Sequence, residues 1–373
     1  MNKTPILLAL AVLLLIGCNP KSKRSKPDVP VTHISVLKND IINQPVSYFI
    51  EVDSIVALET NDYSKIGEIY KVDVTDDRIY VMDNSVARAM FCFDRKGNFI
   101  NAFHSLGNGP DEYSRLEYFD VYNDTVYITA DPYKLFQLDK DLNLIENISI
   151  SWPEGEFIGY RIHALNNDTI LFTAFENPFN FYFYDLSRKK FISTLSKSSG
   201  SFTWVGVSRI TLDNVTHYTY SKEFYDTIYL LTPEKMTPHV IVDFEDPVPP
   251  EICRQKEVLH PFNRRIRPEE MRDIRRYYET DSYIYFSFVY QQRFHYLFFN
   301  KSNSKAKILR NDMTNDVFGS RYFPLTKGTY KNSIITPVDA SDLIENRDKI
   351  TTRVPGNLNY NSNPVLVFFH PKF

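Results

Sequence analysis

The sequence predicts an all-β protein, a six-bladed β-propeller of four-stranded antiparallel blades whose last blade is closed by strands from both ends of the chain. Three observations lead to this prediction. The chain is rich in short runs of β-branched and aromatic residues bounded by Asn, Asp, Gly and Pro, and beyond residue 30 it lacks long stretches of 3.6-residue periodicity. One strand-containing unit recurs along the chain, and unmatched strands stand near both ends.

The recurring unit begins with a polar turn that contains Asp or Asn, followed by a strand of mostly apolar residues. Asp76 and Asp77 form the first of these turns, and Asn123 and Asp124 form the second. The strands that follow the turns, called anchors below, are residues 79–81, 126–128, 170–172, 217–219, 284–286 and 334–336. Six anchors predict six blades.

Each anchor is followed by a second apolar strand, which often ends in an acidic residue or Asn. These second strands are residues 91–94, 136–139, 183–185, 228–231, 297–300 and, after a delay in the sixth unit, 365–369. In the first unit a turn at Gly97 leads to a further strand, residues 99–103. The anchors lie about 44 to 50 residues apart, except for one interval of about 67 that contains a Pro-rich, charged insertion at 247–272, and this spacing is typical of propeller blades.

Ring closure is predicted from two strands that belong to no complete unit of their own. Residues 48–58 form an alternating strand before the first full blade, and residues 365–369 form a strand at the C-terminal end. A shared last blade would leave no sheet edge between the first and last blades, so these two strands are expected to pair.

The N-terminus has the layout of a secretory signal peptide. Lys3 precedes an apolar run, and the segment ends in Leu15, Ile16, Gly17 and Cys18, which resembles the bacterial lipobox. We expect residues 1–17 to be removed and Cys18 to become the lipidated first residue; an uncleaved anchor is the alternative, although the run is short for a membrane span.

Residues 18–45 are expected to form a flexible tether, and residues 46–373 the propeller. The tether is polar and rich in Lys, Ser and Pro at its start, and no acidic residue follows Cys18 before Asp28. Because surface-exposed lipoproteins of Bacteroidota usually carry acidic residues there, we expect an outer-membrane lipoprotein on the periplasmic face. Its basic residues would contact lipid headgroups or act as a solvated spacer.

Composition excludes two classes of protein. Besides Cys18 there are only two cysteines, Cys92 and Cys253, so a disulfide framework is not expected. The formal net charge of -3 gives no basic excess for nucleic acid, and 43% hydrophobic residues support a large core. The chain is expected to be a monomer that contacts the membrane through its lipid.

The chain resembles the six-bladed β-propeller lipoproteins of Bacteroidota, a family without a settled activity. The resemblance rests on the lipobox, on Leu58-Glu59-Thr60 and Ile66-Gly67, on Phe93-Asp94 with Gly97, and on the run Gly107-Asn108-Gly109-Pro110-Asp111-Glu112-Tyr113. It covers nearly the whole mature chain and implies the same fold and location. The family motif usually has Gly at the position of Asp111.

Candidate ligand-binding residues come from two places. The 107–113 loop would hold Glu112 and Tyr113 at the channel rim, or would only connect blades one and two. Counting back eight to eleven residues from the anchors places further polar residues on the channel-lining strands: Glu68, Glu117, Arg161, Arg209 and Arg275, with only Leu325 or Thr326 in the sixth unit. These charges would form a paired ring, or the arginines would grip an anionic or sugar-like ligand.

No catalytic motif is present, including the sialidase Asp-box, the kelch di-glycine, the WD dipeptide, nucleotide-binding glycine loops and G-x-S-x-G. We therefore expect a non-catalytic binding or scaffold module for a glycan, peptide or protein, without a cofactor. The sequence does not distinguish a sensor role from this binding role. The alternative is a hydrolase or lactonase with calcium in the channel, where Glu68 and Glu117 would be the first ligands to test. The 247–272 insertion would be a docking surface for a partner or a solvent-exposed loop between blades, and a helix is expected to start near Pro268.

Overall fold

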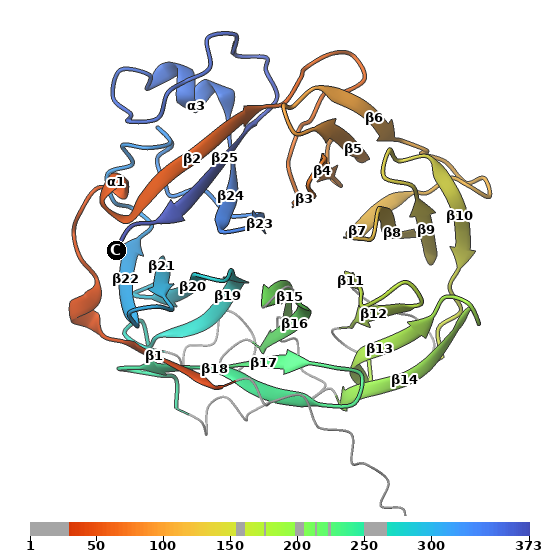
Figure 1. The fold of residues 1–373 in the computed structure, drawn as a ribbon, viewed down its shortest axis with the longest axis horizontal. Coiled ribbons are helices and arrows are strands. Elements are labelled where there is room, and N and C mark those ends of the chain that lie inside the picture. The colour runs from red at the N-terminus through yellow and green to blue at the C-terminus, as the bar shows by residue number, and fades with distance from the viewer. Residues whose placement is uncertain are drawn as a thin grey trace, which may run out of the picture. The chain divides into compact units, whose positions relative to one another are not determined.

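The computed structural model describes residues 30–153, 161–174, 177–197, 205–212, 215–222, 225–249 and 267–373. The expected signal peptide, Cys18 and the central part of the insertion lie outside these residues. The chain divides into two units, residues 1–30 and 31–373, and the second unit is the propeller. The prediction of six blades is confirmed, because six sheets surround one axis (Figure 1).

Each blade contributes one strand at each of four radial positions. The innermost strands are β3 (Lys71–Val74), β7 (Arg115–Tyr122), β11 (Arg161–Ala164), β15 (Val205–Leu212), β19 (Arg272–Glu279) and β23 (Gly328–Tyr330). The second strands are β4 (Arg78–Asp83), β8 (Thr125–Asp131), β12 (Thr169–Thr173), β16 (Val215–Lys222), β20 (Tyr283–Tyr290) and β24 (Ser333–Val338). In each blade, the strand at the second position contains one predicted anchor, so the predicted repeat is confirmed.

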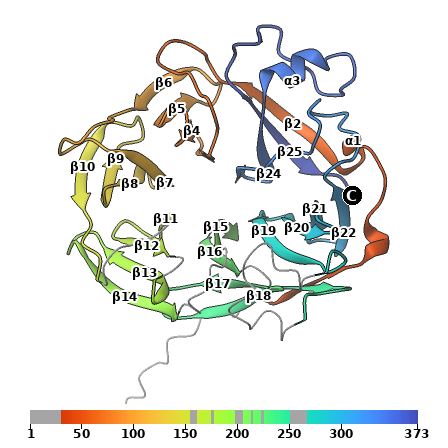
Figure 2. The same cartoon turned by 180° about the vertical axis from the view of Figure 1, so that it is seen from behind.

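The two outer positions complete the blades, which are numbered 1 to 6 from β3 onward. The third strands are β5 (Ala89–Asp94), β9 (Lys134–Leu138), β13 (Phe179–Asp185), β17 (Thr227–Leu231), β21 (Arg293–Asn300) and β25 (Val365–Pro371). The outermost strands are β6 (Phe99–Phe103), β10 (Leu144–Ser149), β14 (Lys190–Lys197), β18 (Met236–Phe244), β22 (Lys305–Arg310) and β2 (Ile50–Ala57). Figure 2 shows the same arrangement from behind.

The ring is closed in blade 6 as predicted. Strand β2 pairs antiparallel with β25, with Ile55 opposite Val367, although the two segments lie at opposite ends of the chain. This outer strand follows a single helical turn, α1 (Val46–Phe49), and a second short helix, α3 (Ala340–Glu345), lies between β24 and β25. The propeller therefore needs both ends of the chain to complete one sheet.

The propeller begins earlier than expected, because residues 31–45 are not a tether. Strand β1 (Thr32–Val36) pairs in parallel with β18 and makes blade 4 five-stranded, and a short 3-10 helix, η1 (Lys38–Asp40), follows it. Ile34 and Val36 are buried in the core between blades 4 and 5. The N-terminal segment thus runs around the outside of blades 4 and 5 before it enters blade 6 (Figure 1).

Six hydrophobic clusters hold the blades together, one at each blade-to-blade boundary. Strands in the middle of the blades, such as β4, β5 and β20, are buried along almost their whole length, so each sheet buries both faces against its neighbours. Cys92 is fully buried in the cluster between blades 1 and 2. Because each cluster is made from two neighbouring blades, removal of one blade would expose apolar surface on two others.

The turns between third and fourth strands explain why those strands end in Asp. The Asp94 carboxylate accepts hydrogen bonds from the backbone N–H groups of Lys96 and Asn98, and Asp139 does the same for Asp141 and Asn143. Gly97 has a φ of 90°, which favours glycine. The acidic residue at each strand end is therefore part of the turn itself.

The expected helix start near Pro268 is absent from the described residues, where residues 268–270 form a turn that leads into β19. The backbone N–H of Glu270 bonds the carbonyl of Arg267, and the Glu270 carboxylate binds the Arg267 side chain. Local composition suited a helix here, but the innermost strand of blade 5 begins immediately afterwards.

Candidate ligand-binding site at the propeller axis

The six innermost strands bring one equivalent residue each to the same level of the axis. The pairing between the innermost strand and the next strand of each blade identifies these residues, because each of them lies opposite the second residue of the anchor in its blade. They are Asp73, Asp120, His163, Arg209, Tyr278 and Gly328, opposite Tyr80, Tyr127, Leu171, Tyr218, Tyr285 and Ile335. We call this set the axial ring.

Arg209 links blades that face each other across the axial ring. Its guanidinium donates to both carboxylate oxygens of Asp73 at 2.8 Å, and a second ion pair joins it to Asp120 at 3.6 Å. Asp73 belongs to blade 1 and Arg209 to blade 4, so the side chain crosses the axis. Arg209 also donates to the backbone carbonyl of Val121.

Lys71 completes the neutralisation of the two ring carboxylates. Its Nζ lies 3.5 Å from Asp120 and donates to the carbonyl of Phe119 at 2.5 Å. Asp120 in turn accepts the backbone N–H of Ala164 at 2.9 Å. Burial alone would lower the pKa of Arg209, yet Asp73 and Asp120 raise it above its usual value, so the guanidinium is charged at neutral pH.

A second group of polar residues surrounds the ring of Tyr118. Lys71 Nζ lies 4.4 Å and Arg161 Cζ 5.5 Å from its centroid, and the imidazole of His163 lies 5.8 Å away. His163 is 2% exposed, and neither ring nitrogen has a hydrogen-bond partner among the described residues. Burial, together with the charges of Lys71 and Arg161, lowers the pKa of His163 well below its usual value, so the imidazole is neutral.

Blades 5 and 6 add two more cations close to this level. Tyr278 donates from its hydroxyl to the carbonyl of Thr326 at 3.4 Å, which joins the two innermost segments directly before Lys327. Arg276 precedes Tyr278 on β19, and both Arg276 and Lys327 are half-buried. Burial and the Arg276 charge lower the pKa of Lys327, so the two cations repel each other.

Gly328 is the ring member without a side chain, and the packing of the blades explains it. A Cβ at this position would lie 2.8 Å from the backbone carbonyl oxygen of Val72 in blade 1. The innermost strands of blades 6 and 1 therefore approach closely at the point where the ring is closed.

The structure places the predicted channel residues at several levels. Arg161, Arg209 and Arg275 lie on innermost strands, and so does Glu117, at a register shift where it pairs with Arg115. Glu68 is exposed and precedes β3, and its carboxylate accepts a hydrogen bond from Ser85. Arg275 lies 3.7 Å from Asp273. In blade 6, Leu325 is exposed and the hydroxyl of Thr326 donates to Tyr285.

Sequence reasoning missed Lys71, Asp73, Asp120, His163, Arg276 and Lys327. The ring residues lie about six to eight residues before the start of each anchor, not eight to eleven, because tight turns join the first two strands of the blades. A shorter count back from the anchors would have found Asp73 and Asp120.

The 107–113 loop is held together by its own residues. The Glu112 carboxylate accepts the backbone N–H of Gly109 at 2.7 Å, and Lys134 Nζ donates to the carbonyls of Gly109, Pro110 and Glu112. Tyr113 is fully buried and its hydroxyl donates to the carbonyl of Arg88. The Glu112 carboxylate, the Tyr113 hydroxyl and the loop carbonyls are thus already hydrogen-bonded within the protein. This arrangement supports the role of the loop as a connection between blades 1 and 2.

No set of three or more His, Cys, Asp or Glu side chains in the described part of the chain is arranged to hold a metal ion. Glu68 and Glu117, the first candidates for calcium, contact Ser85 and Arg115 instead of each other.

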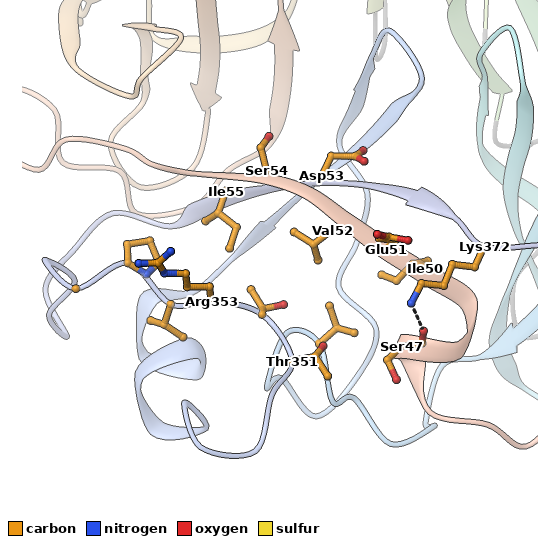
Figure 3. Close-up of a pocket in the computed structure, with 15 residues that line it drawn as sticks. Ser47, Ile50, Glu51, Val52, Asp53, Ser54, Ile55, Thr351, Arg353 and Lys372 are labelled. Atoms are coloured by element: carbon orange, nitrogen blue, oxygen red, sulfur yellow. Dashed lines mark hydrogen bonds between the residues drawn. The ribbon is translucent and has the colours of Figure 1, made fainter.

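A separate groove of about 850 Å³ lies between β2 and the segment that follows α3 (Figure 3). Val52 and Ile55 line it from the strand, and Arg353 stands at the opposite side. Thr352, also in the lining, is 6% exposed and its hydroxyl has no hydrogen-bond partner among the described residues. Lys372 at one end donates to the carbonyl of Ser47.

Comparison with known proteins supports the fold. The family model described as a domain of unknown function, DUF4934, matches residues 31–370. A solved structure of an exported-protein candidate from Bacteroides fragilis matches with a TM-score of 0.73 and 15% identity, covering 92% of this chain and 100% of that one. No curated protein matches the sequence.

Two other solved structures match over similar lengths but with lower scores. U3-55K has a TM-score of 0.45 and 8% identity, covering 86% of this chain and 99% of that chain. The WD40 domain of Neurospora crassa Pan2 has a TM-score of 0.43 and 10% identity, with 87% and 95% covered. The Bacteroides fragilis match, at its low identity, is evidence for the propeller fold alone.

Proposed function

The chain belongs to the DUF4934 family, and we propose that it is a lipid-anchored, non-catalytic binding protein of the bacterial cell envelope that takes its ligand at the propeller axis. The observation that carries the binding role is the convergence of charged side chains from opposite blades on the axis. Lys71, Arg209 and Arg276 come from blades 1, 4 and 5, and each is partly exposed. A packed apolar axis would have been sufficient for stability.

The anchor is supported by the sequence before residue 30. The apolar run ends in Leu15-Ile16-Gly17-Cys18, and the domain match begins at residue 31. Within the described residues, no helix has the length and apolar character needed to cross a membrane. The Bacteroides fragilis protein of similar fold is described as an exported-protein candidate, which agrees with this location. The absence of acidic residues between Cys18 and Asp28 favours the periplasmic face of the outer membrane.

Acylation tests the anchor. We expect wild-type protein to incorporate labelled palmitate and to sediment with the outer membrane, and Cys18→Ala to lose both properties. Cys253→Ala is the matched control and should keep the label, since Cys253 lies far beyond the lipobox. Palmitate labelling of Cys18→Ala, or its retention on membranes after a carbonate wash, would show that the anchor lies elsewhere.

Protease treatment tests the membrane face. A periplasmic protein should survive protease added to intact cells and be digested after the outer membrane is permeabilised. Digestion in intact cells would place it on the cell surface.

Binding is tested with glycan and peptide arrays and by cross-linking in native envelopes. We expect a saturable ligand whose binding is weakened by Arg276→Gln and unaffected by Lys305→Gln, because Lys305 is exposed at the start of β22, the outermost strand of blade 5. Absence of any ligand in all three assays would contradict the binding role.

A further inference from the structure

The charges at the axis do not balance. In the axial ring, Asp73 and Asp120 are matched by Arg209 and Lys71, with distances of 2.8 to 3.6 Å between partners. The two carboxylates of the ring are therefore neutralised by one cation of the ring, Arg209, and by Lys71, which lies two residues before Asp73 on β3.

Arg276 and Lys327 remain outside this neutralisation. Neither side chain forms an ion pair or hydrogen bond with any described residue, in contrast to most of the other cations on the innermost strands. The exposed carboxylate of Glu68 attracts Lys327 electrostatically but forms no ion pair with it. This carboxylate instead accepts a hydrogen bond from the Ser85 hydroxyl. The hydrogen bond from Tyr278 to the carbonyl of Thr326 brings the segments of these two half-buried cations together. Two such cations without a carboxylate partner among the described residues are unfavourable in the absence of an anion.

The surroundings of these cations suit an anion in three respects. Both side chains keep part of their surface in contact with solvent, so a ligand can reach them. Arg161 contributes a further positive charge, which acts on Tyr278 together with that of Arg276. Arg209 crosses the axis at the level of the ring, so a ligand that enters from the side of Arg276 would meet a closed floor.

We propose that the axis binds a compact oxyanion, a carboxylate or phosphate group, between Arg276 and Lys327, with Arg161 providing additional positive charge. The planar guanidinium of Arg276 suits two parallel hydrogen bonds to such a group, and the ammonium of Lys327 suits a single one. The inference rests on the proposed binding function and names the chemical class of its ligand. An acidic sugar, a peptide carboxylate or a phosphate-bearing molecule would present this group.

The test uses the purified full chain in detergent, with thermal unfolding and titration calorimetry. The probes are inorganic phosphate and D-glucuronate, and D-glucose is the uncharged counterpart of the second probe. We expect at least one of the anions to raise Tm in a saturable manner and glucose to leave it unchanged. A response to phosphate alone or to glucuronate alone would support the site and identify the source. No response to either anion, or an equal response to glucose, would overturn it.

Variants locate the site. Arg276→Gln and Lys327→Gln should each weaken anion binding at least tenfold, Lys327→Arg should retain it, and the control Lys305→Gln should bind as wild type. In anion-free buffer both Gln variants should have a Tm equal to or above that of wild type, because a repulsion is removed. A lower Tm in that buffer, or undiminished anion binding, would overturn the assignment. Palmitate labelling of Cys18, and ligand capture by the wild-type chain on arrays and in native envelopes, do not require the ligand to be an anion, so they test the proposed function separately.

Discussion

Arg209 and Asp73 form a two-point ion pair between blade 4 and blade 1, the blades that face each other across the propeller axis, with both nitrogen-oxygen distances at 2.8 Å. The six hydrophobic clusters, by contrast, join neighbouring blades. This pair instead spans the ring. Its side chains meet at the level of the axial ring.

Breaking this pair should destabilise the whole propeller. Arg209→Met leaves Asp73 and Asp120 in a buried position with one cation fewer, and the expected loss in the free energy of unfolding is about 3 kcal/mol. Asp73→Asn should cost less, because Asp120 still pairs with Arg209. Urea unfolding of both single variants and the double variant measures the coupling; costs that simply add would show that the pair contributes nothing as a unit.

Stability should fall at mildly acidic pH because of buried neutral histidines. Burial lowers the pKa of His163 well below its usual value and that of His295 to about 4. Below pH ~6.5 these histidines bind a proton in the unfolded chain but not in the folded chain. Each therefore lowers the free energy of unfolding by up to about 1.4 kcal/mol for each pH unit until its folded pKa is reached. Above that pH neither residue has this effect.

Urea unfolding between pH 4.5 and 8 of wild type and His163→Phe checks this expectation. The variant should show the shallower decline on the acid side and the same stability dependence above pH 7. His33→Phe is the control, since His33 is exposed and pairs with Asp243 at the surface. Parallel curves for wild type and His163→Phe would contradict the prediction.

The first strand should contribute to stability as part of the propeller. Ile34 is 1% exposed and packs between blades 4 and 5, so Ile34→Ala should reduce the free energy of unfolding by about 2 to 3 kcal/mol. Leu37→Ala is the matched control: Leu37 is 45% exposed, and the expected change is below about 0.5 kcal/mol. Equal small effects of both substitutions would mean that β1 does not hold its place on blade 4 in solution.

Thr352 offers a test of an unsatisfied buried hydroxyl. Its side chain lines the groove beside β2 without a hydrogen-bond partner among the described residues. Replacement by the isosteric Val removes the polar atom and keeps the volume, so Thr352→Val should stabilise the protein by up to about 1 kcal/mol. Thr351→Val is the comparison, because the Thr351 hydroxyl donates to the carbonyl of Asp316 and its loss should destabilise. Destabilisation by Thr352→Val would indicate that a bound water or ligand uses the hydroxyl.

Local pattern determined most of the blade structure in advance. An Asp or Asn turn and an alternating strand are short-range features, and so the anchors at Ile79, Val126 and Ile284 could be recognised without knowledge of the fold. The pairing of the two chain ends was predicted for the same reason, since each end contained a strand that lacked a local partner. The lipobox around Cys18 is also a local pattern and needs no tertiary structure.

The tertiary structure alone decided which residues meet at the axis and where the propeller begins. Asp73 and Arg209 are 136 positions apart, and no local spacing relates them. Strand β1 directly follows the Lys-, Ser- and Pro-rich segment. Only its pairing with β18, about two hundred residues away, makes it part of a sheet. Side chains from separate blades combine into a charged site only after six sheets close into a ring, because the axis is the one place where all the innermost strands come together.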